Sequence, residues 1–147
     1  MEKIIIIIVT LLLASQSSFC CDCNSETKSV KQAVADSKEV FVGTVISSII
    51  SNITFKNGPH IVTFQEIRLK IDLPLFGDST KEITVLTDQS DCGQMLKEGR
   101  KYLVYAFVGY RTKKLELHEC HAYCPEASSK EAQNAIHVIR KMYKKKR

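Results

Sequence analysis

The sequence predicts a mainly β fold with flanking helices, organised as one domain. Stretches rich in β-branched residues recur between residues 39 and 117, and turn-forming residues separate them. Apolar residues at helix spacing occur instead on either side of this region. The 147 residues are 44% hydrophobic and 25% charged, which suits one compact core and leaves little room for a second domain.

Residues 1–20 have the pattern of a signal peptide. A charged end, Met1 to Lys3, precedes a mostly apolar stretch from Ile4 to Leu13 that is too short to span a bilayer. Small and polar residues from Ala14 to Ser18 then suit a signal peptidase. We therefore expect a mature chain of residues 21–147 that is secreted, or periplasmic in a bacterium. No later stretch is apolar enough for a transmembrane segment.

Export determines how the six cysteines are interpreted. An oxidising compartment favours disulfides over reduced thiols or soft metal sites, so pairing is the default expectation. Three of the cysteines, Cys20, Cys21 and Cys23, lie within four residues at the end of the predicted signal peptide and the start of the mature chain.

The formal charge of +5 belongs to the C-terminal tail. The last eight residues, "RKMYKKKR", hold six positive charges, which leaves −1 for the rest of the chain. A solvated terminus is the simplest interpretation, and binding to anionic lipid or a polyanion is the alternative. A nearly neutral body argues against nucleic-acid binding, which needs a basic groove.

A short helix and a long strand are predicted first. Ser25 to Thr27 forms a helix start, Val30, Ala33 and Val34 share one face, and the helix should end near Ser37. From Glu39 the sequence "EVFVGTVISSII" predicts a strand, with Gly43 as a bend or bulge.

Four further strands are predicted, separated by the turn residues Asn57-Gly58-Pro59, Pro74 and Gly77. They are Ile61 to Leu73, a segment around Ile83, Val85 and Thr87, the run "RKYLVYAFV", and "KLELHEC" with Leu115 and Leu117 on one face. The segment "SDCGQMLKEG" between the third and fourth strands is expected to be a loop or a helical turn.

The last element that the sequence predicts is a C-terminal helix. Ser128 and Glu131 form a capping-box pattern, and apolar residues recur at helix spacing at Ala132, Ala135, Ile136, Ile139 and Met142 or Tyr143. Such a stripe is most often core packing. A five-stranded antiparallel Greek-key barrel of the OB type is the simplest architecture for a helix, five short strands and a closing helix.

The cysteine pattern supports a more specific comparison. A mature chain would begin Cys21-Asp22-Cys23, with Cys92 in "DCG", Cys120 in "LHEC" and "FVGT" from Phe41 to Thr44 in the first strand. This pattern resembles the N-terminal domain of the tissue inhibitors of metalloproteinases, a netrin-like module built on an OB barrel. The resemblance covers essentially the whole mature chain, so residues 21–147 are expected to form one netrin-like domain with a C-terminal helix and a basic tail.

The resemblance implies two disulfides, Cys21–Cys92 and Cys23–Cys120, whereas six cysteines alone allow 15 connectivities. Each would close a loop of about 70 to 100 residues and stabilise the fold by roughly 4 to 5 kcal/mol before strain. Cys124 has no counterpart in this scheme. It either pairs with Cys20, if cleavage falls earlier, or keeps its thiol.

The resemblance also implies a function, inhibition of a zinc metalloproteinase, with no cofactor of the chain's own. The α-amino group and carbonyl oxygen of Cys21 would chelate the catalytic zinc, and Asp22 would point into the specificity pocket. The adjoining protease contacts would be Cys23, Ser90, Asp91 and Cys92. Where this chain has Asp22, the family usually has Thr or Ser. A carboxylate there would be desolvated beside the protease's own glutamate, so we expect poor inhibition of ordinary matrix metalloproteinases.

Three alternatives are weaker. The stretch "HECHAYC" holds His118, Cys120, His121 and Cys124, all of which are potential zinc ligands, but disulfides are favoured in an exported chain. An enzyme is not expected, because no nucleophile, base and acid occur in a recognisable spacing. The main competitor is a secreted netrin-like interaction module without protease inhibition, because fold does not determine function.

Overall fold

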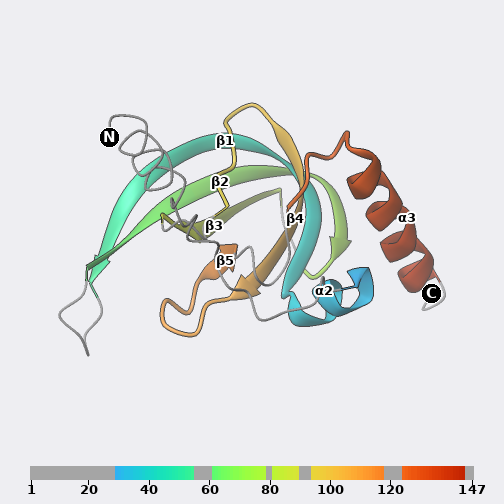
Figure 1. Ribbon diagram of the computed structural model, residues 1–147, viewed down its shortest axis with the longest axis horizontal. Helices are drawn as coiled ribbons and strands as arrows, with labels where there is room; N and C mark the ends of the chain where they lie inside the picture. Colours follow the sequence, from blue (N-terminus) through green and yellow to red (C-terminus); the bar gives the residue numbers. More distant parts are fainter. Residues whose placement is uncertain (1–28, 55–60, 79–80, 90–93, 118–123, 145–147) are drawn as a thin grey trace, which may run out of the picture.

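A computed structural model describes residues 29–54, 61–78, 81–89, 94–117 and 124–144. Within these ranges the chain forms the helices and strands α2 (Val30–Asp36), β1 (Glu39–Thr54), β2 (Ile61–Phe76), β3 (Glu82–Asp88), β4 (Lys101–Val108), β5 (Leu115–Leu117) and α3 (Lys130–Lys144). The predicted mainly β composition with flanking helices is therefore confirmed (Figure 1).

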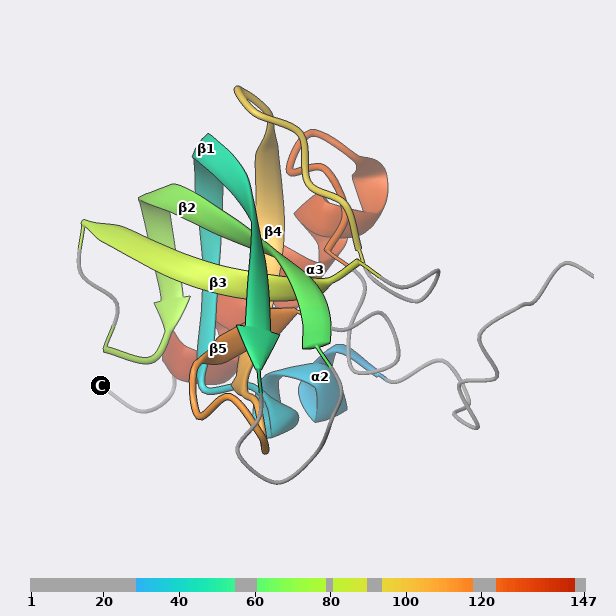
Figure 2. The ribbon, with the colours of Figure 1, turned by 90° about the vertical axis from the view of Figure 1, so that its left-hand side faces the viewer.

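The five strands form a closed ring in the order β1-β2-β3-β5-β4, and β4 pairs back to β1. Figure 2 shows the strands curving around a common interior. Every pairing is antiparallel except β3 with β5, which run parallel. The sheet is thus mixed, whereas the sequence predicted an antiparallel one. The parallel pairing arises because the chain between β3 and β5 crosses back as β4 before β5 joins the ring.

Strand β1 bends because its register shifts repeatedly. Shifts against β2 occur between Val40 and Phe41, between Val42 and Gly43, and between Val45 and Ser47. A Cβ atom at Gly43 would lie 2.9 Å from the ring of Phe41 and 3.0 Å from the carbonyl oxygen of Lys70, so a larger residue would force the backbone apart. The predicted irregularity at Gly43 is confirmed, and it lets β1 pair with both β2 and β4.

Strand β2 extends further than predicted. The sequence indicated a break at Pro74, but the strand continues to Phe76 and Pro74 pairs with Phe41. Proline is tolerated at this point because β3 pairs with β2 only between Phe64 and Lys70, so Pro74 has a neighbouring strand on one side alone. The chain turns at Gly77, the second of the two predicted breaks, where φ is +100°.

The two helices are capped by serine side chains. Ser29 Oγ accepts a hydrogen bond from the Gln32 N–H at the start of α2, and the helix ends at Ser37 as predicted. The predicted capping box of α3 is wrong by one residue. Ser129, not Ser128, caps this helix, because its hydroxyl accepts from the Ala132 N–H at 3.1 Å.

One hydrophobic core joins the ring to both helices. The apolar stripe of α3 is buried as predicted, with Ala132 and Ile139 fully inaccessible, and Tyr143 stacks on Phe76 of β2 at a centroid distance of 5.4 Å. Val34 of α2 is 1% exposed and belongs to the same core. Figure 1 shows α3 packed beside the ring at the opposite end of the long axis from the β1–β2 hairpin. Burial of each large side chain contributes roughly 1.5 to 3 kcal/mol.

Candidate functional site

The candidate site lies where β3 and β5 end. In the parallel pairing Leu86 is opposite Glu116 and Thr87 is opposite Leu117, so both strands finish at the same end of the ring. Thr87 and Leu117 are 0% and 2% exposed, so both strands are buried in the fold at this end. Residues 90–93 follow β3 and residues 118–123 follow β5. The two chain segments that carry Cys92 and Cys120 therefore start from neighbouring positions.

The same two segments also end at neighbouring positions. The Gln94 side chain donates from Nε2 to the Cys124 carbonyl oxygen at 2.7 Å, and its Oε1 accepts from the Cys124 N–H at 2.8 Å. Gln94 is 8% exposed and Cys124 is fully buried. A pair of buried hydrogen bonds of good length holds the two backbones in a defined relative position.

The ends of the first segment also contact each other. Gln89 Nε2 lies 3.8 Å from the sulfur of Met95. This contact joins the residues on either side of residues 90–93. The Met95 side chain itself is 58% exposed, whereas its neighbour Leu96 is buried in the core. The structure thus exposes the apolar side chain of Met95 three residues after Cys92 in the sequence.

Cys124 lies in an apolar setting against β4. Burial raises the pKa of the Cys124 thiol to about 12, and a hydrogen bond from the Tyr105 backbone opposes that change only in part. Burial likewise raises the pKa of the Tyr105 phenol to about 12, with smaller contributions from the charges of Cys124 and Glu131. Burial therefore favours the neutral thiol at Cys124.

Three of the four potential zinc ligands, His118, Cys120 and His121, lie outside the described residues. Within the part of the chain that the structure describes, no group of three or more His, Cys, Asp or Glu side chains is arranged to hold a metal ion. Over the same residues, no helix combines the length and the apolar character needed to cross a membrane.

The residues predicted to act on a protease lie outside the described ranges. These are Cys21, Asp22, Cys23, Ser90, Asp91 and Cys92, and the predicted disulfide partner Cys120 lies outside them as well. The disulfides Cys21–Cys92 and Cys23–Cys120 stay predictions. What the structure adds is the position of the residues on either side, namely Gln89 and Gln94 around Cys92, and Leu117 and Cys124 around Cys120.

Sequence reasoning missed Gln94. The residue follows "DCG" in a polar stretch that reads as an ordinary loop, and no periodicity marks it as buried. Its role depends on Cys124, which is 30 residues away in the chain. A buried amide that satisfies a distant backbone has no local sequence pattern, so this contact becomes visible only in three dimensions.

A comparison of the chain with protein-family models finds no match, and a comparison with curated proteins finds none either. The class defined by the fold is a mainly β chain whose five strands close into a ring flanked by two helices in the described ranges.

Proposed function

We propose that this chain is an exported inhibitor of zinc metalloproteinases that acts through its N-terminus at Cys21. The barrel would be of the OB-like Greek-key type found in netrin-like domains. Two disulfides, Cys21–Cys92 and Cys23–Cys120, would hold the first residues as a rigid projecting wedge. The observation that carries the proposal is the pair of hydrogen bonds between Gln94 and the backbone of Cys124. These bonds join the residue that follows the segment of Cys92 to the residue that follows the segment of Cys120.

The two predicted disulfides limit how far apart Cys92 and Cys120 can lie. Cys21 and Cys23 are two residues apart, so their Cα atoms lie within about 7 Å of each other. A disulfide spans a Cα separation of up to about 7 Å, so the two partner cysteines must lie within roughly 20 Å of each other. Gln94 touches Cys124 directly. Cys92 is two residues from Gln94 and Cys120 is four from Cys124, reaches of at most about 7 and about 14 Å. These maximal reaches add up to more than 20 Å, but they include separations of Cys92 and Cys120 short enough for both disulfides.

The chemistry of the wedge is suited to zinc. A catalytic zinc keeps one coordination position open for water, and an α-amine with its neighbouring carbonyl oxygen forms a five-membered chelate at that position. An α-amino group has a pKa of about 7.7 to 8.0, so it loses its proton to the metal at modest cost. Rigid disulfides remove most of the ordering entropy before binding, which strengthens a small contact.

Exposed Met95 supports a protein-contact role at this end of the ring. Methionine is flexible and polarisable, and it adapts well to a partner surface. Asp22 sets the expected specificity. A carboxylate in an apolar specificity pocket is unfavourable, so the target protease should have a polar or basic pocket rather than an apolar one.

The test compares the secreted wild-type protein with a variant that has one alanine inserted before Cys21. Both are assayed against a panel of zinc endopeptidases with apolar, polar and basic specificity pockets. We expect the wild type to inhibit at least one member and the extended variant to lose inhibition, because the chelating amine is displaced. Asp22→Thr serves as the matched specificity variant and should shift inhibition towards proteases with apolar pockets. Equal potency of the extended variant would reject the mechanism.

A second candidate function is a secreted netrin-like interaction module without protease inhibition. The observation that favours it is a set of exposed isoleucines on the β1–β2 hairpin, Ile46, Ile49, Ile50 and Ile61, which are 42% to 68% exposed. Such residues suit contact with another protein. A wild-type chain that carries an unblocked Cys21 yet inhibits no protease of the panel would favour this function.

A further inference from the structure

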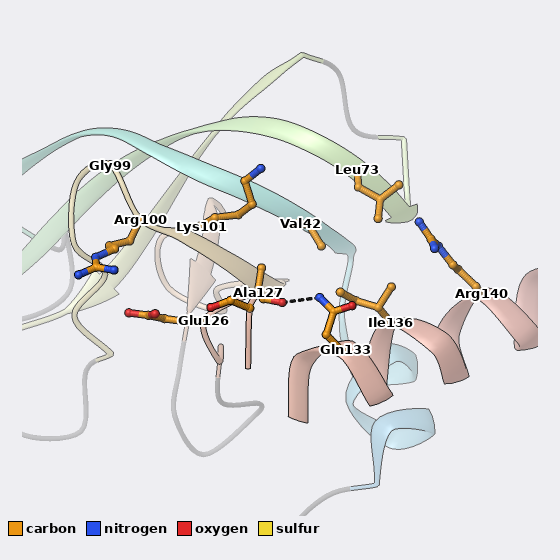
Figure 3. A pocket seen from close by; sticks show the side chains of 11 residues that line it. Val42, Leu73, Gly99, Arg100, Lys101, Glu126, Ala127, Gln133, Ile136 and Arg140 are labelled. Carbon is orange, nitrogen blue, oxygen red and sulfur yellow. Dashed lines mark hydrogen bonds between the residues drawn. The ribbon is translucent and has the colours of Figure 1, made fainter. Parts of the chain in front are cut away.

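A cavity of about 580 Å³ lies between α3 and the ring, and its lining includes neither Gln94, Met95 nor Cys124. Its walls come from β1, β2, the turn before β4, the turn before α3 and α3 itself, as Figure 3 shows. The volume falls within the range of about 300 to 1,000 Å³ that is usual for small-molecule sites. Nothing in the proposed inhibitory mechanism uses this cavity.

The floor of the cavity is apolar. Val42 of β1, Leu73 of β2 and Ile136 of α3 line it, and Val42 and Ile136 are 5% and 7% exposed. These side chains come from three different elements that share one core, so the floor is held in place by the fold. A hydrocarbon group that covered the floor would remove further apolar surface from water.

The rim carries three cationic side chains and one carboxylate, namely Arg100, Lys101, Arg140 and Glu126. Lys101 is already neutralised, because its Nζ lies 3.2 Å from Asp72 Oδ2. Asp72 in turn accepts a hydrogen bond from the Thr44 hydroxyl at 2.6 Å, which helps to keep its carboxylate ionised. Lys101 is therefore a poor candidate for binding an anion.

The two arginines differ in their surroundings. Figure 3 shows Arg100 and Glu126 at one end of the cavity, whereas Arg140 extends from α3 at the other end, close to Leu73 and Ile136. The Glu126 carboxylate disfavours an anion near Arg100. Among the described residues no carboxylate forms an ion pair with Arg140, so its guanidinium is available to a ligand.

We propose that this cavity binds a linear aliphatic carboxylate, with the carboxylate on Arg140 and the hydrocarbon chain over Val42, Leu73 and Ile136. A guanidinium matches a carboxylate through two parallel hydrogen bonds, and such charge-assisted pairs are among the stronger polar contacts. The apolar floor beside Arg140 supplies a place for the chain. The site is independent of Cys21, so it stands or falls separately from the proposed inhibitory function.

The experiment titrates the full secreted chain with decanoate below its micelle concentration, followed by calorimetry and by backbone amide NMR shifts. Acetate tests the head group alone, and decanol tests the chain without charge. We expect saturable decanoate binding with shifts at residues around Arg140 and Leu73, and at least tenfold weaker binding of acetate and of decanol. Equal binding of decanol, equal binding of acetate, or no saturable binding of decanoate would overturn the proposal.

Two matched variants locate the head group. Arg140→Gln should weaken decanoate binding roughly tenfold or more, because a charge-assisted pair is lost. Lys141→Gln removes the same charge one residue further along α3, from an exposed position outside the cavity, and should leave binding unchanged. Equal weakening by both substitutions would mean that only general charge attraction is at work, which would contradict the assigned position.

Discussion

Gln94 and Cys124 are joined by two hydrogen bonds of 2.7 and 2.8 Å, one in each direction, although 30 residues separate them in the chain. Through this contact the segment that follows β3 and the segment that follows β5 are fixed to each other at their far ends. The parallel pairing of Thr87 with Leu117 fixes them at their near ends. The proposed inhibitory wedge depends on both contacts.

Removal of the Gln94 side chain should destabilise the protein. Gln94→Ala removes two hydrogen bonds from the buried backbone of Cys124, and we expect a loss of about 2 to 4 kcal/mol in the free energy of unfolding. Urea denaturation of the secreted protein measures it. Gln32→Ala is the control, since the Gln32 side chain donates to Asp36 on an exposed helix surface and its loss should cost less than about 0.5 kcal/mol. Similar values for the two variants would show that the Gln94 contact contributes little.

Substitution of Met95 should affect inhibition without affecting folding. Met95→Lys places a charge where the proposed protease contact is apolar, so we expect inhibition to weaken by about tenfold or more. The inhibition constant and the melting temperature are measured together. Val138→Lys introduces the same charge on α3, at a position that is 36% exposed, and should leave inhibition unchanged. If both variants inhibit like the wild type, Met95 is not part of the contact surface.

The pKa of Asp72 should lie below the ordinary aspartate value of 3.8, chiefly because of the hydrogen bond from Thr44 and then because of Lys101. A lowered pKa in the folded state stabilises the protein above pH 3.8, and this contribution is lost as the pH falls through the lowered pKa. Thr44→Val should therefore raise the pKa of Asp72, which carboxyl-carbon NMR measures directly. Thr84→Val, at an exposed position on β3, should leave the pKa of Asp72 where it is. An unchanged pKa in Thr44→Val would contradict the assigned cause.

Tyr105 should make the fold sensitive to alkali. Burial raises the pKa of its phenol from 10.0 to about 12. A raised pKa means that its contribution to stability is complete below pH 10 and is lost as the pH rises towards 12. Between these values the stability of Tyr105→Phe should fall less steeply than that of the wild type. Tyr110, which is 87% exposed, provides the control, because Tyr110→Phe should follow the wild-type curve. Parallel curves for all three proteins would rule out the effect.

The parts of the fold that sequence predicted well are those determined by local pattern. The apolar stripe of α3 and the bend at Gly43 follow from residue spacing and backbone freedom, and both are present. Pro74 misled the prediction, because whether proline breaks a strand depends on how many strands flank it. The parallel pairing of β3 with β5 and the Gln94–Cys124 contact depend on tertiary arrangement, which no local pattern encodes. The cysteine-bearing site itself rests on sequence, with support from the described residues around it.

Peptide mapping of the secreted, unreduced protein by mass spectrometry tests the central claim most directly. The account predicts a mature chain that begins with an unmodified α-amine at Cys21, with Cys21 linked to Cys92 and Cys23 linked to Cys120. A chain that begins at another residue, an acylated N-terminus, or Cys21 joined to a different cysteine would contradict it.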